Sequence, residues 1–298
     1  MSDPIAFMSI SKPIDVPQAL PPAVRARLLA GQRQVTGAGN ERVVWHAWGA
    51  PGDTPPVVLL HGGSGSWTHW VKNIVPLLDA GRWVLAADMP GFGDSDPPAT
   101  GNDADAMAAP LAAGLRALVP GVAVDLVGFS LGGLVSARLL TAQPELARRL
   151  VLVGAPAMGV AGERPVQLKA WRHLPTRAQQ LEHHRHNLAV LMLHDARAID
   201  ALALELHAAN VVRDRLPRRR RSFADWLART LAGLRCPVHA IYGAQDALYV
   251  PHVRQLDAAF AAAAPDFRGL QLIEGAGHWV QFEAPEAFNA ALARALAC

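Results

Sequence analysis

The sequence has little cysteine and lacks any apolar run of the length that crosses a membrane. Of its 298 residues only two are cysteines, Cys236 and Cys298, too few for a disulfide framework, and this scarcity favours a reducing compartment, the cytoplasm. A membrane-spanning helix needs about 18 or more uninterrupted apolar residues, and no stretch approaches that length. The first residues also lack a basic segment followed by a long apolar core, so we expect neither a secretory signal nor a membrane as partner.

Charge is scarce as well. Charged residues make up 18% of the chain, the formal net charge is +3, and hydrophobic residues reach 51%. So small a positive excess does not favour nucleic acid as a partner, and we interpret four consecutive arginines at 218–221 as a solvated helix start or loop. The composition instead predicts a globular chain with a sizeable core.

Short apolar runs of the kind that form buried strands recur along the chain. A run that is apolar throughout is typical of a strand covered on both faces of a parallel sheet. Such runs stand at 56–60, 83–87, 124–127, 150–153, 238–242 and 270–273. Helical patterns lie between most of them, and the segment 42–48 alternates as an exposed strand does. This order predicts an α/β fold, a three-layer α/β/α sandwich around a mostly parallel sheet.

The alternation of strands and helices stops between residues 157 and 234. Patterns in this block are helical only, with amphipathic segments at 188–192 and 199–209. We therefore predict an α/β core at 1–156 and 235–298 and an inserted helical cap at 157–234. Apolar cap residues can either line a pocket or form the face of a homodimer: Leu191, Met192 and Leu193.

The motif Gly-Phe-Ser-Leu-Gly at 128–132 follows one of the predicted strands and precedes a predicted helix. In this context the pattern G-x-S-x-G is a nucleophile elbow, a sharp turn that projects the serine hydroxyl above the sheet edge. Glycines allow so tight a turn, and the positive end of the helix lies at the same point. The motif makes Ser130 the candidate nucleophile.

A catalytic serine needs a base, and the base needs an acid that orients it. Asp246 and His278 each lie in the short segment just past the end of a predicted strand. The order Ser, Asp, His along the chain, with each residue at the carboxyl end of a strand, predicts a triad of Ser130, Asp246 and His278. Two other aspartates compete for the role of the acid, but Asp257 falls within a predicted helix and Asp266 within a turn.

Stabilising an oxyanion requires two preorganised backbone donors. The residue after the nucleophile, Leu131, supplies one N–H group. The loop His-Gly-Gly-Ser-Gly-Ser at 61–66 follows a buried strand, and we assign Gly63 as the second donor, with Ser64 next. A phosphate-binding interpretation of this loop is disfavoured, because it contains neither G-K-[ST] nor G-x-G-x-x-G.

Together these segments resemble the α/β-hydrolase family, in its serine-nucleophile branch. The resemblance runs from about residue 40 to the C-terminus, on motifs at 61–63, 88–95, 128–133, 243–246 and 277–278. It implies the fold and the triad given above, a loop at 88–95 that helps to shape the pocket, and a cap that closes over the triad and selects substrate. Fold resemblance does not by itself identify the substrate.

A serine nucleophile narrows the reaction that this resemblance implies. Haloalkane dehalogenases and epoxide hydrolases of the family use aspartate there, so esters, thioesters, lactones and certain carbon–carbon bonds remain. The segment 277–283, with Trp279 after the histidine, is similar to the carbon–carbon hydrolases that cleave meta-ring-fission products of aromatic degradation. Those enzymes carry Asn where this chain has Phe129. They also carry a cap arginine near the place of His207, for which Arg213 or Arg215 could substitute.

We therefore expect a serine hydrolase that cleaves a carboxylic ester or related acyl bond of a small apolar substrate, with carbon–carbon bond hydrolysis as the alternative. Its substrate pocket is expected to include Ser64, Phe129, His207 and Trp279. The reaction requires no metal and no organic cofactor. Two further readings use the same fold, namely a receptor for a small molecule and a perhydrolase with the same triad.

Histidines and tryptophans gather in the predicted cap. Four histidines invite a metal site, but no carboxylate or cysteine clearly completes one, so we interpret them as solvated. They are His183, His184, His186 and His194. Trp171 and Trp226 are candidates for lining an apolar pocket.

Overall fold

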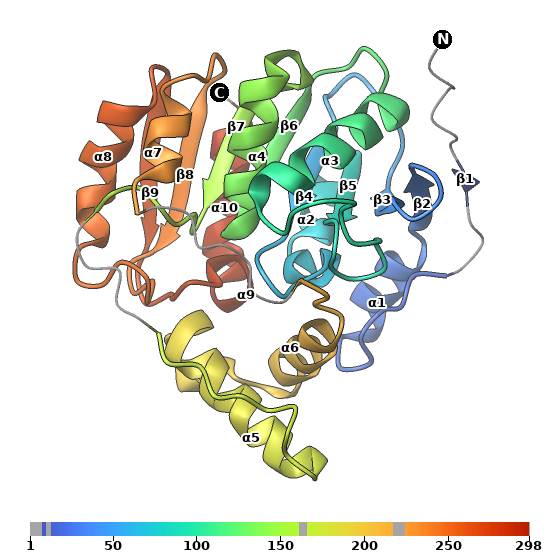
Figure 1. Cartoon of the computed structure of the whole chain (residues 1–298), viewed down its shortest axis with the longest axis vertical. Helices are drawn as coiled ribbons and strands as arrows, with labels where there is room; N and C mark the ends of the chain where they lie inside the picture. The colour runs from blue at the N-terminus through green and yellow to red at the C-terminus, as the bar shows by residue number, and fades with distance from the viewer. Residues whose placement is uncertain (1–7, 10–12, 161–165, 217–223, 298) are drawn as a thin grey trace.

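The computed structural model describes residues 8–9, 13–160, 166–216 and 224–297; Cys298 and the arginines at 218–221 lie outside the described residues. Within them the chain forms a nine-stranded sheet in the order β1-β2-β3-β5-β4-β6-β7-β8-β9 (Figure 1). The strands are β1 (Met8–Ser9), β2 (Gln32–Thr36), β3 (Val43–Trp48), β4 (Val57–Leu60), β5 (Val84–Asp88), β6 (Val124–Phe129), β7 (Ala147–Val153), β8 (Val238–Gly243) and β9 (Phe267–Ile273).

The sheet is parallel from β5 to β9 and antiparallel at its other edge. Val58 of β4, for example, pairs in parallel with Leu85 of β5 and with Leu126 of β6. The strands β1, β2 and β3 form an antiparallel series that joins β5. The sequence does not predict β2, because Gln32–Thr36 is largely polar and holds its place by pairing with β3. The α/β fold with a mostly parallel sheet is confirmed.

Helices cover both faces of the sheet. Alternation along each strand separates the faces: in β4, Val58 and Leu60 join one core cluster, while Val57 and Leu59 join the other. The first cluster packs under α3 (Ala104–Leu118), α4 (Leu131–Ala142), α7 (Trp226–Leu231) and α8 (Leu256–Ala263). The second packs under α1 (Pro22–Leu29), α2 (Ile74–Asp79), α9 (Val280–Glu283) and α10 (Pro285–Ala297).

The strand β3 is buried along its whole length, although its alternating sequence predicts an exposed strand. It lies between β2 and β5, and both of its faces are covered. On one face the indole N–H of Trp45 donates to Thr36 Oγ1 at 3.0 Å, and on the other the indole of Trp48 donates to the Leu28 carbonyl at 2.8 Å. Because both indoles find partners, the two tryptophans can be buried at little polar cost.

Between β7 and β8 the described residues form helices and no strand. Helix α5 (Arg177–Asn187) continues into a π-helical turn, Leu188–Met192, and packs against α6 (Ala201–Val212). Both helices lie beyond the strand ends, away from the sheet (Figure 1). Helix α7 differs, because it packs against α4 and α8 in the layer over the sheet. The block 157–234 thus contains one helix that packs with the core layer.

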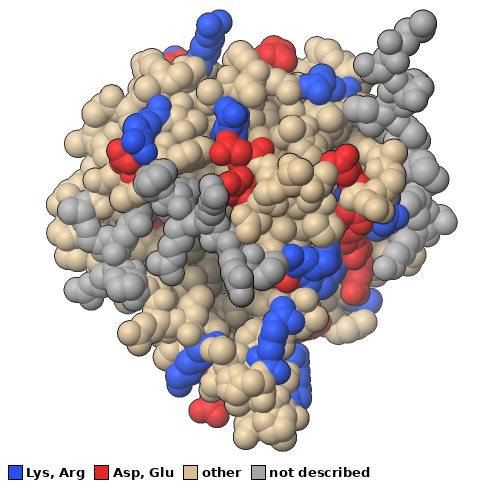
Figure 2. All heavy atoms as spheres, viewed as in Figure 1, with Lys and Arg blue, Asp and Glu red and all other residues tan. Residues whose placement is uncertain are grey.

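Charged side chains of both signs are interspersed on the face shown in Figure 2. Surface ion pairs fit this mixture: Arg42 Nε lies 2.8 Å from Asp96 Oδ2, and Arg254 Nη2 lies 2.9 Å from Glu274 Oε1. In the described part of this face, neither positive nor negative side chains form one large patch. Within the described residues, no helix combines the length and the apolar character that crossing a membrane requires.

Asp125 anchors the start of β6, the strand that leads to Ser130. Its carboxylate is fully buried and meets three arginines, with Arg148 Nε at 2.7 Å, Arg149 Nε at 3.0 Å and Arg82 also in contact. Asp125→Asn leaves these cations without their counter-charge, so we expect unfolding in urea to show a loss of about 3–5 kcal/mol. Glu274→Gln, which breaks an exposed pair, is the control and should leave the midpoint nearly unchanged. A loss below about 1 kcal/mol for Asp125→Asn would contradict this account.

Candidate active site

Ser130 occupies the turn between β6 and α4, with φ 51° and ψ −116°. A positive φ is strained for a residue other than glycine, and such strain is typical of a nucleophile elbow. The backbone approaches closely on both sides of the turn. A Cβ atom on Gly132 would lie 2.4 Å from the Leu60 carbonyl oxygen, and one on Gly128 would lie 2.5 Å from the Gly132 carbonyl oxygen. A larger residue in place of either glycine of the motif would therefore clash with the neighbouring backbone.

The side chains of Ser130, His278 and Asp246 form a hydrogen-bonded chain. Ser130 Oγ lies 3.0 Å from His278 Nε2, and His278 Nδ1 lies 2.9 Å from Asp246 Oδ2. Asp246 is fully buried, and its Oδ1 accepts from the Leu248 N–H at 3.0 Å. Because a carboxylate only accepts, the imidazole proton belongs on Nδ1, and Nε2 is left to accept from the serine hydroxyl.

The three residues meet because each follows a parallel strand: Ser130 follows β6, Asp246 follows β8 and His278 follows β9. The carboxyl ends of these strands share one edge of the sheet. The competing aspartates lie elsewhere. Asp257 is exposed on α8, and Asp266 Oδ1 pairs with Arg268 Nε at 2.5 Å.

The glycine loop after β4 lies beside the serine. A Cβ atom on Gly62 would lie 3.2 Å from Ser130 Cβ, and the Gly62 N–H donates to His69 Nδ1 at 3.2 Å. Burial, followed by the nearby histidines, holds the pKa of His69 well below its ordinary value, so the ring is neutral and Nδ1 can accept. The Gly62 amide is thus engaged within the loop. Gly63, the next residue, lines a cavity, and Leu131 is the first residue of α4, where backbone N–H groups lack an acceptor within the helix.

A hydrogen bond joins this loop to the inserted block. The Ser64 hydroxyl donates to Asp214 Oδ2 at 2.6 Å, and Asp214 Oδ1 accepts from the Leu216 N–H at 3.0 Å. Ser64 has φ 52°, a strained value for serine. Asp214 therefore anchors the strained turn that follows Gly63.

The two arginines considered as substitutes for a cap arginine are engaged elsewhere. Arg213 Nη2 lies 2.5 Å from Asp94 Oδ1, and Arg215 donates to the Gly93 carbonyl at 3.0 Å. Both acceptors belong to the loop at 88–95. These contacts fasten the end of the inserted block to that loop, and neither arginine is among the residues that line the two cavities bounded by Gly63 and by Gly277.

Phe129 and Trp279, expected at the substrate pocket, are buried to 0% and 1% exposure. The Phe129 ring lies 5.0 Å from that of His278, between centroids. Trp279 stacks on Phe282 at 4.2 Å and donates its indole N–H to the His69 carbonyl at 3.0 Å. Both side chains therefore support the histidines by packing, and neither is among the lining residues of the adjacent cavities.

Two neighbouring cavities lie between the core loops and the inserted block. The smaller has a volume of about 480 Å³ and is bounded by Gly63, Ser64 and His69 of the core. On the side of the inserted block it is lined by residues that include Trp171, His207 and Asp214. Of the pocket residues expected from the sequence, Ser64 and His207 thus share one cavity.

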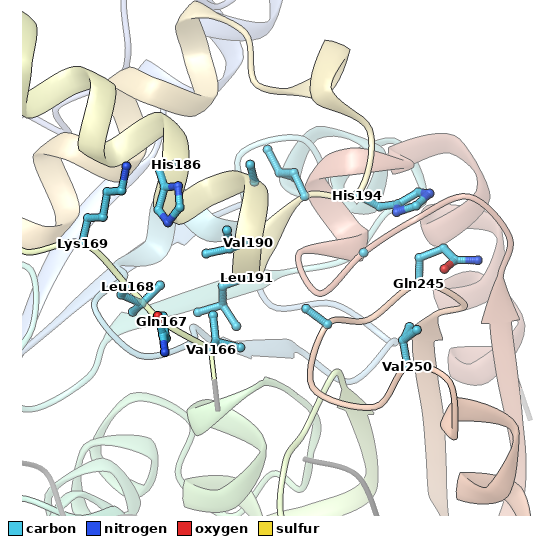
Figure 3. Close-up of a pocket in the computed structure, with 14 residues that line it drawn as sticks. Val166, Gln167, Leu168, Lys169, His186, Val190, Leu191, His194, Gln245 and Val250 are labelled. Carbon is cyan, nitrogen blue, oxygen red and sulfur yellow. The ribbon is translucent and has the colours of Figure 1, made fainter. Parts of the chain in front are cut away.

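The larger cavity has a volume of about 770 Å³. Gln245 and Val250, from the loop after β8, face it from the core, and Val190 and His194 face it from the inserted block (Figure 3). Leu191 lines both cavities, whereas Met192 lines the smaller and Leu193 the larger. These apolar residues therefore contribute to cavity walls.

The prediction that the histidines of the inserted block are solvated is wrong for one of them. His194 is exposed and His186 lines the larger cavity, but His184 has no exposed surface. It is buried because α5 packs on α6 and on Trp171, whose ring centroid is 4.8 Å away. Trp171 lines the smaller cavity, while Trp226 packs against the core cluster instead. No group of three or more His, Cys, Asp or Glu side chains suited to a metal occurs in the described ranges.

A sequence model with the description "Alpha/beta hydrolase family" matches residues 57–291. Curated relatives include the 2-hydroxy-6-oxononadienedioate/2-hydroxy-6-oxononatrienedioate hydrolases of Cupriavidus pinatubonensis and Escherichia coli. The first is 28% identical over 247 residues, which cover 78% of this chain and 83% of the relative. The second is 28% identical over 251 residues, which cover 78% and 84%.

Solved structures of esterases share the fold. Carboxylesterase CesB (YbfK) from Bacillus subtilis matches with a TM-score of 0.70 and 19% identity, over 91% of this chain and 93% of its own. Naproxen esterase (carboxylesterase NP) from the same organism matches with a TM-score of 0.68 and 22% identity, over 89% and 90%. At such low identity the likeness concerns the fold alone.

Proposed function

The chain belongs to the alpha/beta hydrolase family, and from this premise we propose a serine hydrolase that cleaves a carboxylic ester or related acyl bond of a small, largely apolar substrate. One observation carries the proposal: the hydrogen-bonded chain of Ser130, His278 and Asp246 at the carboxyl edge of the sheet. Two cavities, of about 480 and 770 Å³, are lined by Gly63 and by Gln245 and Gly277, the residues before Asp246 and His278, and they have the volume of small-molecule sites.

The proposed reaction has two steps. His278 Nε2 takes the Ser130 proton while the serine oxygen attacks the ester carbonyl, and the backbone N–H groups of Leu131 and Gly63 stabilise the oxyanion. Collapse of this intermediate breaks the bond to the alcohol, which leaves with the proton from His278. Water then attacks the acyl-serine with His278 again as base, which releases the acid and restores Ser130. Asp246 keeps the proton of the imidazole on Nδ1 and stabilises the imidazolium.

A second candidate function is hydrolysis of a carbon–carbon bond next to a carbonyl. Two curated relatives that match most of this chain carry names of such hydrolases, and their named substrates are dioates. Lys169 and Arg172 line the smaller cavity and offer cations for a carboxylate. We rank this function second because Phe129 stands before the nucleophile and because Arg213 and Arg215 are engaged by the loop at 88–95.

A stopped-flow absorbance experiment distinguishes the two candidate functions. The assay compares p-nitrophenyl acetate and butyrate with a ring-fission dienol-diketone. Fast release of nitrophenol without bleaching of the diketone supports the esterase. Bleaching at a much higher kcat/KM assigns carbon–carbon hydrolysis instead. Slow or absent turnover of both, with slow labelling of Ser130 by a fluorophosphonate, indicates a binding protein.

The hydrogen bond between Ser64 and Asp214 should matter for turnover. Ser64→Ala and Asp214→Ala each release the turn next to Gly63, so we expect kcat to fall about tenfold with KM within about twofold. The double variant should lose no more than either single one, because both remove the same interaction. Asp214→Asn keeps an acceptor oxygen and should recover most of the activity. Fully additive losses, or a change in KM alone, would show that the bond does not position the loop.

A further inference from the structure

The inserted block lies against the loop that carries His278. A Cβ atom on Gly277, the residue before the histidine, would lie 2.8 Å from the His194 backbone nitrogen and 3.2 Å from the Met192 carbonyl oxygen. The same Met192 carbonyl accepts from the N–H of Trp279, the residue after the histidine, at 2.7 Å. Both neighbours of His278 in the chain are therefore packed on or bonded to the inserted block.

The side chain of Glu283 joins the same two segments. Its Oε2 accepts from the Gly277 N–H at 2.6 Å, and its Oε1 accepts from the Asp195 N–H at 2.6 Å. Glu283 is the last residue of α9, the short helix that follows Trp279. Hydrogen bonds to a carboxylate are short and roughly twice as strong as those between neutral groups. One side chain thus binds both the loop of the histidine and the inserted block.

His278 needs such support because its ring serves two partners at once. Its Nε2 lies 3.0 Å from Ser130 Oγ, and its Nδ1 lies 2.9 Å from Asp246 Oδ2. The end of β7 limits the ring on one side, where a Cβ atom on Gly154 would lie 3.2 Å from Nδ1. The backbone at Gly277 sets where the ring begins. A shift of Gly277 therefore changes both hydrogen bonds of the imidazole.

The loss of the Glu283 carboxylate should displace the loop without unfolding the chain. Gly277 is buried, but it lines the larger cavity, and Glu283 itself is half-buried. Water in that cavity can hydrate the freed Gly277 N–H group. A mobile water does not hold the group at a fixed place, so the cost falls on the position of His278.

We infer that Glu283 is a positioning residue for His278, and that it works as a bridge between the loop of the histidine and the inserted block. It acts through the Gly277 N–H group, and this contact maintains the distance from His278 Nε2 to Ser130 Oγ. The inference rests on the proposed function, because it concerns the base of the same site. It implies that the inserted block influences the reaction through this loop as well as through the cavities that it lines.

Turnover of p-nitrophenyl butyrate tests the role of Glu283. Glu283→Ala removes both acceptors, and we expect kcat to fall about 10²-fold with KM within about threefold, because a displacement of about 1 Å at a reacting centre has an effect of that size. Glu283→Gln keeps one acceptor oxygen and should lose only about tenfold. Glu286→Gln changes an exposed residue of the adjacent helix α10 and is the matched control, with kcat expected within about twofold.

Proton NMR distinguishes positioning from a general loss of stability. The Nδ1–H proton between His278 and Asp246 should resonate far downfield, because it lies in a hydrogen bond to a carboxylate. In folded Glu283→Ala this resonance should shift or broaden, whereas Glu286→Gln should keep it as in wild type. Thermal melting verifies that each spectrum comes from folded protein, and Glu283→Gln takes the place of Glu283→Ala if alanine unfolds the chain.

Two variants of Asp195 test the bridge to the inserted block. Asp195→Pro removes the N–H group that donates to Glu283, and the φ of −82° at this residue is close to the value that proline requires. Asp195→Ala keeps the N–H group, and both variants lose the ion pair with Arg197. We expect Asp195→Pro to lower kcat about tenfold relative to Asp195→Ala. It should add no further loss to Glu283→Ala, because both remove the same interaction.

Several outcomes would overturn the inference. One is a kcat of Glu283→Ala within about threefold of wild type, and another is an unchanged downfield resonance in that variant. Equal kcat of Asp195→Pro and Asp195→Ala would refute the bridge. A rise in KM with kcat unchanged would also overturn the inference, because Glu283 would then shape a cavity instead of placing the base.

The proposed function can fail separately from this inference. Labelling of Ser130 by a fluorophosphonate also requires His278 as base, but it requires no ester substrate. If wild type hydrolyses no ester, while labelling is fast in wild type and much slower in Glu283→Ala, the esterase is refuted and the role of Glu283 stands. Ester hydrolysis that Glu283→Ala leaves unchanged refutes the positioning role alone.

Discussion

Ser130→Ala should lower kcat for p-nitrophenyl butyrate by at least about 10⁴-fold, while the protein stays folded. The hydroxyl is the atom that attacks in the proposed mechanism, and without it His278 has no nucleophile to activate. Alanine removes one oxygen from a half-buried position, and it keeps the Cβ atom, so the strained turn gains no clash. The measurement is steady-state turnover, with circular dichroism to verify the fold.

Ser136→Ala is the matched control for this variant. Ser136 lies on α4, in the second turn of the helix, and its hydroxyl donates to the Gly132 carbonyl at 2.7 Å inside the helix. Its loss should leave kcat within about threefold, because a neutral hydrogen bond within a helix contributes only about 1 kcal/mol to stability. A fluorophosphonate should label wild type and Ser136→Ala but not Ser130→Ala. Undiminished turnover by Ser130→Ala would refute the assignment of the nucleophile.

Asp246→Asn should lower kcat by about 10³–10⁴-fold with the geometry of the site retained. The asparagine amide can present N–H to His278 Nδ1, which forces the proton onto Nε2 and removes the acceptor that Ser130 needs. The buried position of Asp246 adds to the effect, because water cannot replace the lost carboxylate. Pre-steady-state kinetics should show that formation of the acyl-enzyme slows along with turnover.

The competing aspartates provide the controls. Asp257→Asn changes an exposed residue of α8, and Asp266→Asn breaks an ion pair with Arg268 in a turn. Neither lies in hydrogen-bond contact with His278, so both variants should retain kcat within about twofold. If Asp257→Asn or Asp266→Asn lowers kcat as far as Asp246→Asn, the acid has been misassigned.

The fold and the three residues of the hydrogen-bonded chain were accessible from the sequence because their signals are local. A buried parallel strand is an apolar run, and the residue after it lies at the carboxyl edge of the sheet whatever else the chain does. Ser130 directly follows β6, and Asp246 and His278 lie in the loops after β8 and β9, although β9 is an edge strand and only partly buried. The glycines at 128 and 132 marked the turn because no larger residue fits where backbone approaches backbone.

The burial of particular side chains required the tertiary structure. The alternating pattern of β3 predicts an exposed strand, yet β3 is buried along its whole length between β2 and β5. A histidine-rich helix predicts solvated rings, yet the packing of α5 on α6 and Trp171 buries His184. Exposure depends on which elements pack on a segment, and a pattern along the segment carries only part of that information.

The sequence by itself therefore determined the α/β fold and the placement of Ser130, Asp246 and His278 after parallel strands, because these depend on short-range patterns at strand ends. Only the tertiary structure decided which polar groups of the inserted block meet the core. Asp214 reaches Ser64 across 150 positions of the chain, and Arg213 reaches Asp94 across 119. Such pairs form because packing brings distant segments within about 3 Å, the range of a hydrogen bond, and no local periodicity encodes that encounter.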